Sequence, residues 1–479
     1  MKYSSFAGLS PRIARHSKIV LGFFRRVLRA LTRRIKIWIE DGQIWAQLRL
    51  KHRSHAIVAE PGEESHILYV LHNALPFASG GYANRAQGLA EGLAEADFRV
   101  TCVTRPGFPS DLKNFLGNQP REPWEVGGVR YRAVASPSYR SYSGYDYIVR
   151  ASRSLESVIR EERPSVVIGA SNYLTALPAL LAAKRCGVPF IYEVRGFWEI
   201  TRASRDPSFL DSPQYREMVR RETLTAKEAE LVVTLGGGMK QELENRGVSS
   251  DRIVIAPNAV TPSLYDKPSK AKFSRTGLHR SAETLVIGYV GTFVDYEGLH
   301  DLLRACEILV ERQLNFHLLL VGSDLVTGSF GTFGDELKRM ARSLGLSEYV
   351  TFEGRLSPDE ARSVYSVIDV CVLPRLSSRV TEMVTPLKPL EAFAGGAALV
   401  AADIQPLREI SGDGSRGLLF ESGDFKGLAD ILTALVEDPE RARSMAKIAR
   451  RWTEQHRTWG IVGSGLGQQL RGLSSQQKA

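Results

Sequence analysis

The 479-residue chain lacks the long apolar run that marks a membrane-spanning helix. Such a helix needs about 20 predominantly apolar residues, whereas the longest mildly apolar stretch, Ala392 to Ile404, is shorter and contains two glycines and an aspartate. Cysteine is scarce too, because the four residues Cys102, Cys186, Cys306 and Cys371 form no CxxC pair. These absences argue against an integral membrane protein, a disulfide scaffold and a zinc module, and they favour a reducing compartment.

Two phosphate-binding patterns and a metal-binding pattern are also missing. The chain contains no GxxxxGK(S/T) run, which excludes a P-loop ATPase. The one loose glycine repeat, Gly463-Ser-Gly465-Leu-Gly467, follows no apolar strand and so does not open a dinucleotide-binding unit. No His, Cys, Asp or Glu cluster has the spacing of metal ligands, and we therefore expect no metal and no other resident cofactor.

The net charge of +10 is confined to one segment. Residues 1–60 hold 13 of the 63 Lys and Arg residues but only 3 of the 53 Asp and Glu residues, so the other 419 residues carry 50 of each and are neutral. A neutral body has no basic stripe for nucleic acid, and we expect no nucleic-acid partner.

Within the basic segment, Ser17 to Trp45 is predicted to form one amphipathic helix. Its apolar stripe at helical spacing comprises Val20, Phe24, Val27, Leu28, Leu31, Ile35 and Trp38, and its flanking bases are Arg25, Arg26, Arg29, Arg33 and Lys36. This pattern is typical of a helix that lies on an anionic membrane surface. The alternative is a helix that packs its stripe on the protein body. A signal peptide is excluded because Arg25 and Arg26 interrupt the apolar region.

The rest of the chain alternates apolar strands with amphipathic helices, twice over. The strands expected in the first half are His66–Leu71, Arg99–Arg105, Val166–Ser171, Phe190–Arg195, Leu231–Leu235 and Ile253–Ala256. Those of the second half are Leu285–Val290, His317–Val321, Val350–Phe352, Val370–Leu373, Ala398–Ala402 and Leu418–Phe420. Such alternation predicts parallel sheets covered by helices, hence an α/β protein with two Rossmann-like domains facing each other across a cleft.

The expected organisation has five parts. Residues 1–60 are the basic helical extension, residues 61–262 the N-terminal domain on the acceptor side, and residues 263–280 a polar linker. Residues 281–455 form the C-terminal domain on the nucleotide side, and residues 456–479 form a C-terminal segment whose tail is expected to be partly disordered.

Glycines stand where the first strand of each half should end. Gly80 and Gly81 follow the first strand, and Gly291 with Thr292 follows the first strand of the second half. Backbone N–H groups exposed there can bind an anion. The alternative is that the glycines are present only because the turn needs their backbone conformation.

The segment Thr385-Pro386-Leu387-Lys388-Pro-Leu-Glu391 leads into a predicted helix. A diphosphate beside it would gain N–H donors, the Thr385 hydroxyl and the charge of Lys388. Glu391, one turn into the helix, can accept hydrogen bonds from two ribose hydroxyls. The alternative is a capping arrangement with solvated charges.

Eight segments in this order make the chain from about Ser65 to Trp459 resemble a family 4 glycosyltransferase with the GT-B fold. They are Ser79-Gly80-Gly81, Tyr192–Glu199, Ala256–Val260, Tyr289–Gly298, Leu319–Gly322, Phe352–Arg355, Thr385–Glu391 and Gly417–Phe420. The resemblance implies transfer of a sugar from a nucleotide-diphosphate donor with retention and without a required metal. Its acceptor would be a glycan or a lipid-linked saccharide, and its role cell-surface polysaccharide synthesis.

The resemblance and the local chemistry together suggest roles for individual residues. We expect Lys388 and Arg195 to be catalytic. The expected donor-binding residues are Gly80, Gly81, Gly291, Thr292, Arg355, Thr385, Pro386, Leu387, Lys388 and Glu391. His72, Glu193 and Glu382 are expected to contact donor or acceptor.

The chain departs from the family pattern at three places. Glu382 lies nine residues before Glu391 rather than eight, Arg195-Gly196 replaces a common His-Asp pair, and Glu297 lies where a basic pair after Gly291 is usual. We expect Lys388 and Arg355 to replace that basic pair at the diphosphate.

Two other functions are consistent with these departures. The first is a non-catalytic protein with this fold that assembles at a membrane surface. The second is a nucleotide-sugar epimerase of similar architecture, which the Thr385–Glu391 segment disfavours. The expected location is the cytoplasm, peripheral on the inner face of the membrane.

Overall fold

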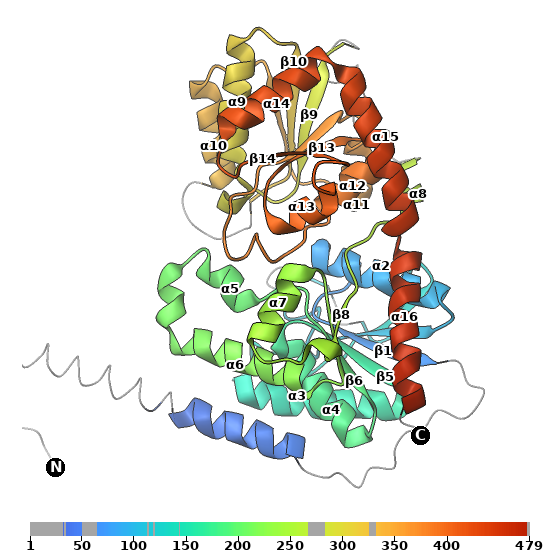
Figure 1. Ribbon diagram of the computed structural model, residues 1–479. Coiled ribbons are helices and arrows are strands. Elements are labelled where there is room, and N and C mark those ends of the chain that lie inside the picture. Colours follow the sequence, from blue (N-terminus) through green and yellow to red (C-terminus); the bar gives the residue numbers. More distant parts are fainter. Residues whose placement is uncertain are drawn as a thin grey trace, which may run out of the picture.

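The computed structural model describes residue 32 and residues 35–49, 65–112, 115–117, 120–142, 144–266, 283–324 and 332–476. Two α/β domains stand one above the other in Figure 1, each built on its own sheet. The sheets are parallel except at one edge strand. This confirms the predicted pair of Rossmann-like domains.

The N-terminal domain contains an eight-stranded sheet in the order β3-β4-β2-β1-β5-β6-β7-β8. Its strands are β1 (His66–Leu71), β2 (Arg99–Thr104), β3 (Trp124–Val126), β4 (Val129–Arg132), β5 (Val166–Ala170), β6 (Phe190–Glu193), β7 (Leu231–Thr234) and β8 (Ile253–Ile255). Its helices are α2 (Gly81–Glu95), α3 (Gly144–Glu162), α4 (Tyr173–Cys186), α5 (Trp198–Ala203), α6 (Pro213–Glu228) and α7 (Gly237–Asn245). Several predicted strands end one or two residues early, because their last residues turn into the loops at the sheet edge.

The C-terminal domain contains a six-stranded parallel sheet in the order β11-β10-β9-β12-β13-β14. Its strands are β9 (Leu285–Val290), β10 (Phe316–Val321), β11 (Val350–Glu353), β12 (Val370–Leu373), β13 (Ala398–Ala402) and β14 (Leu418–Phe420). Its helices are α9 (Leu299–Glu311), α10 (Phe333–Ser343), α11 (Pro358–Val364), α12 (Lys388–Gly395), α13 (Gln405–Ser411), α14 (Phe425–Glu437) and α15 (Pro439–His456). The short helix α8 (Ser263–Asp266) leads out of the N-terminal domain, and most of the predicted linker lies outside the described residues.

Two features of the N-terminal domain were not predicted. Strands β3 and β4 form an antiparallel hairpin whose turn, Gly127-Gly128, has positive φ at both residues, a conformation that glycine adopts at low cost. Helix α16 (Trp459–Gln476) returns from the C-terminal domain and packs along α2. Trp459 lies so close to α2 that a Cβ on Gly88 would come within 2.2 Å of its ring. The expected C-terminal segment is thus a helix at least as far as Gln476.

Residues 35–49 form a helix at the base of the N-terminal domain, below α3 and α6 in Figure 1. Ile44 and Leu48 are buried in the same hydrophobic cluster as α3 and α4. By contrast, Ile35 and Trp38 of the predicted stripe are exposed, while the other five stripe residues lie outside the described residues. The helix therefore docks on the body, but through a face other than the predicted one.

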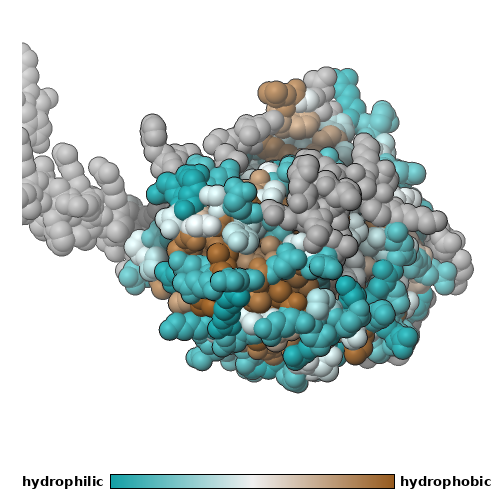
Figure 2. Space-filling model, turned by 90° about the horizontal axis from the view of Figure 1, so that it is seen from above, coloured by the Kyte–Doolittle hydropathy of each residue, from teal (hydrophilic) through white to brown (hydrophobic). Residues whose placement is uncertain are grey.

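Among the helices that the structure describes, none is both long and apolar enough to cross a bilayer. Figure 2 looks down from the end that carries the C-terminal domain and shows hydrophobic areas interspersed among hydrophilic side chains. Such a mixture is ordinary for a folded protein.

Candidate active site

The candidate site lies where the carboxyl ends of the parallel strands of both domains face each other. Strand β1 ends before His72, and β9 ends before Gly291. Helix α12 begins at Lys388, after the loop that follows β12. In parallel α/β sheets these strand ends are where ligands bind, because the loops there present backbone N–H groups and helix N-termini.

Lys388 is the best-defined cation of the site. Its Nζ lies 2.8 Å from Glu297 Oε2 and 2.9 Å from the Tyr289 hydroxyl oxygen. Burial lowers the pKa of the Lys388 ammonium, and Glu297 opposes that shift. The side chain keeps 16 % exposure, so it is held in place by a carboxylate yet remains accessible to a ligand.

Glu297 and Arg375 complete a charge cluster that sequence reasoning missed. Arg375 places NH2 2.8 Å from Glu297 Oε1, and both side chains are nearly buried. Burial alone would raise the pKa of Glu297, but Arg375 and Lys388 outweigh burial and hold the pKa at about 2. These three side chains have a net charge of +1, and Glu391, one turn into α12, is a further carboxylate that interacts with Lys388. In the sequence, the only signal for this cluster was Glu297 itself, an acid at a position where the family usually carries bases.

Gly291 allows Lys388 to approach the first strand of its domain. A Cβ at Gly291 would lie 2.3 Å from Lys388 Cε, which no side chain could tolerate without moving the lysine. Tyr289 accepts a hydrogen bond from Lys388 and donates one to the Thr292 carbonyl at 2.9 Å. The predicted residues Gly291, Thr292 and Lys388 are thus brought together.

Glu391 lies one turn into α12, as the sequence predicts. Its Oε2 accepts a hydrogen bond from the Tyr365 hydroxyl at 3.3 Å. Burial raises the pKa of Glu391, and Tyr365 and Lys388 lower it in part. Among the described residues no ion pair is formed by this carboxylate, which leaves acceptor capacity for a ligand hydroxyl.

The domains contact each other around the predicted donor loop. Asn258 donates a hydrogen bond to the buried Thr385 carbonyl at 2.8 Å, and Leu387 packs against the N-terminal core. A Cβ on Gly81 would be 3.9 Å from Leu387. A second contact between the domains is made by Arg355, which donates to the Ser79 hydroxyl at 3.4 Å, beside Gly80 and Gly81. Pro386 is buried between these contacts.

Arg195 and Glu193 lie inside the N-terminal domain instead of at the cleft. Arg195 Nε donates to Glu193 Oε2 at 2.7 Å, and its NH1 donates to the Tyr82 carbonyl at 2.8 Å. Arg85 Nε donates to Glu193 Oε1 at 2.9 Å, and Tyr69 also donates to Glu193. With both oxygens occupied and 1 % exposure, Glu193 is no nucleophile for a bound sugar. Arg195 therefore contacts the backbone of Tyr82, which follows Gly81, and its guanidinium is taken up by partners within the domain.

The remaining predicted residues, His72 and Glu382, both form hydrogen bonds within the protein. His72 shares a hydrogen bond of 2.9 Å with the Thr175 hydroxyl and meets Trp198 edge-on. Burial, with Arg105 and Arg195 nearby, lowers the pKa of His72 well below its usual value and keeps the ring neutral. Glu382 accepts hydrogen bonds from the Gln405 N–H and the Ser377 hydroxyl, so both of its oxygens serve the fold.

Within the part of the chain that the structure describes, no group of three His, Cys, Asp or Glu side chains is arranged to hold a metal ion. Independence from metal therefore stays a prediction.

Two family models together cover most of the chain. Residues 80–259 match the glycosyl transferase 4-like domain, and residues 272–452 match the glycosyl transferases group 1. The chain is similar to D-inositol 3-phosphate glycosyltransferase of Rhodococcus erythropolis, with 27% identity over 74% of this chain and 78% of the relative. It is also similar to glycogen synthase of Mycobacterium tuberculosis, with 26% identity over 82% of this chain and 91% of the relative.

Solved structures share the fold. Sucrose-phosphate synthase from Thermosynechococcus elongatus superposes with a TM-score of 0.67 at 20% identity, covering 86% of this chain and 100% of that one. Anabaena HepE in complex with UDP superposes with a TM-score of 0.64 at 18% identity, covering 85% of this chain and 100% of that one.

Proposed function

The chain belongs to the family 4-like glycosyltransferases of GT-B fold, and from this premise we propose a specific reaction. The enzyme transfers a sugar from a nucleoside-diphosphate donor to a glycan or lipid-linked saccharide, with retention of anomeric configuration. The reaction serves cell-surface polysaccharide synthesis at the inner face of the cytoplasmic membrane.

The observation that carries the donor assignment is the charge cluster at the start of α12. Lys388 and Arg375 outnumber Glu297, so the cluster has a net charge of +1 in surroundings of low polarity. The positive end of α12 lies at the same place. A diphosphate would compensate this charge, with Lys388 as the cation that it reaches.

The resemblance implies retention, and the chain's own residues favour front-face transfer over a covalent intermediate. A covalent route needs a carboxylate free to attack the anomeric carbon, whereas Glu193 and Glu382 have both oxygens occupied. In front-face transfer the leaving diphosphate takes the acceptor proton. The Gly291 N–H is taken by the Val321 carbonyl at 2.9 Å. Lys388 and the Thr292 amide then stabilise the charge that grows on the diphosphate. Glu391 holds the donor ribose.

The test uses purified full-length protein with UDP-glucose, the sugar nucleotide bound by HepE in a related structure. We expect UDP release that depends on Lys388, and NMR of the product should show the anomeric configuration of the donor. Inversion would overturn the front-face mechanism.

Removing metal ions tests a second part of the proposal. Since helix N-termini and Lys388 replace a cation at the diphosphate, the rate of UDP release should be the same with and without EDTA. Loss of activity that Mg²⁺ or Mn²⁺ restores would contradict this.

The non-catalytic alternative has one observation in its favour, because Glu297 neutralises part of the charge of Lys388. If that alternative holds, calorimetry should detect binding of UDP-glucose. No UDP should then be released in the presence or absence of acceptor saccharides.

A further inference from the structure

The N-terminal helix, residues 35–49, leaves a second apolar face uncovered. Ile35, Trp38, Ile39 and Trp45 are 50%, 77%, 48% and 51% exposed. The described residues include twelve large exposed hydrophobic side chains, and four of them lie on this helix of fifteen residues. We call this set the free face.

The free face cannot turn inward, because the opposite side of the helix is anchored. Ile44 and Leu48 are part of the hydrophobic core of the N-terminal domain. Asp41 Oδ1 accepts a hydrogen bond from Arg221 Nε at 3.1 Å, and Glu40 Oε2 accepts one from Arg221 NH2 at 3.0 Å. Arg221 is 1 % exposed, so rolling the helix would leave its charge buried without these partners.

The free face continues the pattern of the sequence upstream. Ile35 and Trp38 are the two members of the stripe predicted from the sequence that lie within the described residues. Their flanks in the sequence are basic, with 13 Lys and Arg against 3 Asp and Glu in residues 1–60.

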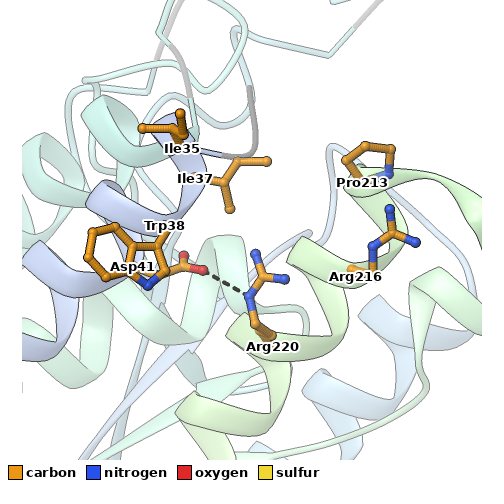
Figure 3. Close-up of a pocket in the computed structure, with 7 residues that line it drawn as sticks. All are labelled: Ile35, Ile37, Trp38, Asp41, Pro213, Arg216 and Arg220. Carbon is orange, nitrogen blue, oxygen red and sulfur yellow. Dashed lines mark hydrogen bonds and ion pairs between the residues drawn. The ribbon is translucent and has the colours of Figure 1, made fainter. Parts of the chain in front are cut away.

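A basic pocket borders the free face. Figure 3 shows Ile35, Trp38 and Pro213 beside Arg216 and Arg220 in a hollow of about 430 Å³. Arg220 pairs with Asp41 at 3.0 Å, whereas Arg216 has no ion-pair partner among the described residues. Guanidinium groups bind phosphate oxygens well, and Trp side chains favour the interface between water and lipid.

We propose that the free face and Arg216 dock the enzyme on a membrane that contains anionic phospholipid. The excess positive charge of the segment opposes a second copy of the chain and selects an anionic occupant. Apolar side chains then enter the headgroup layer while Arg216 and Arg220 contact lipid phosphates. Binding to a membrane requires no turnover, so this inference depends on the proposed function only where it concerns the acceptor.

The experiment is vesicle co-sedimentation of the full-length chain, with phosphatidylcholine alone or mixed with phosphatidylglycerol. Binding should rise with phosphatidylglycerol and fall with salt. The double variant Trp38→Ser and Trp45→Ser should weaken binding about ten-fold or more. The matched control, Ile448→Ser with Ile461→Ser, removes two exposed residues of other helices and should bind as wild type does.

Three results would overturn the proposal. These are equal binding by the Trp variant and the wild type, equal binding to both kinds of vesicle, or a dimer in ultracentrifugation that the Trp variant dissociates. Thermal unfolding identifies a misfolded variant, and Arg216→Glu provides an independent variant of an exposed residue that should also bind weakly. Failure of the proposed function appears separately, as absent UDP release by wild-type protein that still binds vesicles.

Deleting residues 1–60 is a poorer test than these substitutions. The deletion would remove Ile44 and Leu48 from the core and take Glu40 and Asp41 away from Arg221. A loss of binding would then be indistinguishable from damage to the fold.

Discussion

Each domain buries one carboxylate between two cations, and the two clusters differ in a single respect. In the N-terminal domain, Glu193 lies between Arg85 and Arg195, and none of the three side chains is more than 4 % exposed. In the C-terminal domain, Glu297 lies between Arg375 and Lys388.

The difference is the accessibility of one cation. Lys388 keeps 16 % exposure at the start of α12, whereas every polar contact of Arg85 and Arg195 is internal to the N-terminal domain. The same arrangement of charges therefore braces loops in one domain and leaves one cation partly exposed in the other. Through Arg85 and Asn258 the N-terminal cluster also supports Thr385 in the donor loop.

The largest expected effect comes from a substitution in the N-terminal cluster of Glu193, Arg85 and Arg195. Glu193→Gln leaves Arg85 and Arg195 without their shared anion, and removing one partner of a buried ion pair costs about 3–5 kcal/mol. We expect denaturant unfolding to show a loss of this size. Glu440→Gln, in an exposed pair with Arg443, should leave the midpoint unchanged. An unaltered midpoint for Glu193→Gln would show that the cluster is not stabilising.

Substitutions at Lys388 of the C-terminal cluster and at the nearby Glu391 should change the kinetic constants more than the stability. Lys388→Ala should lower kcat by about 10²–10³, because Lys388 meets charge that grows in the transition state. Glu391→Ala should chiefly raise the donor KM, about ten-fold, because a ribose contact is made in the ground state as well. Steady-state kinetics with UDP-glucose measure both constants.

The exposed residue Lys426 on α14 is the control for both variants, and Lys426→Ala should behave as wild type. Wild-type kcat for Lys388→Ala would remove Lys388 from the catalytic residues.

The response to acid should be gradual, because it builds up over more than two pH units. Glu193 and Glu297 have pKa values of about 2 in the folded protein against an ordinary 4.5. Since folding lowers these values, the stability they contribute is complete above pH 4.5 and is lost as pH falls from 4.5 towards 2. Each contributes at most about 3 kcal/mol.

Unfolding free energies measured across that range check the prediction. Glu193→Gln should reduce the slope against pH, because one of the carboxyl groups whose pKa folding lowers is gone. A slope equal to that of the wild type would show that Glu193 does not titrate as described.

Local patterns predicted the elements, and they also singled out the segment that we propose binds the donor. Runs such as Leu285–Val290 and Val370–Leu373 form strands with the predicted bounds, because a strand covered on both faces is apolar throughout. Lys388 and Glu391 were identified because charges interrupt an apolar run just where a helix begins.

Pairings between distant residues could not be predicted in this way. Glu297 lies 91 positions before Lys388, and Arg85 lies 108 positions before Glu193. No periodicity links such residues, so the sequence left Arg195 as a catalytic candidate and Glu297 as a mere departure from the family.

The sequence by itself determined two α/β domains and a basic amphipathic N-terminus, and it singled out the start of α12 as the proposed donor site, since each follows from local apolar periodicity and charge. Only the tertiary structure decided which cations are neutralised and which face of the N-terminal helix is free. Both depend on packing partners far along the chain, such as Arg221 beneath Asp41. An ion pair or a buried helix face exists only once the body has folded around it.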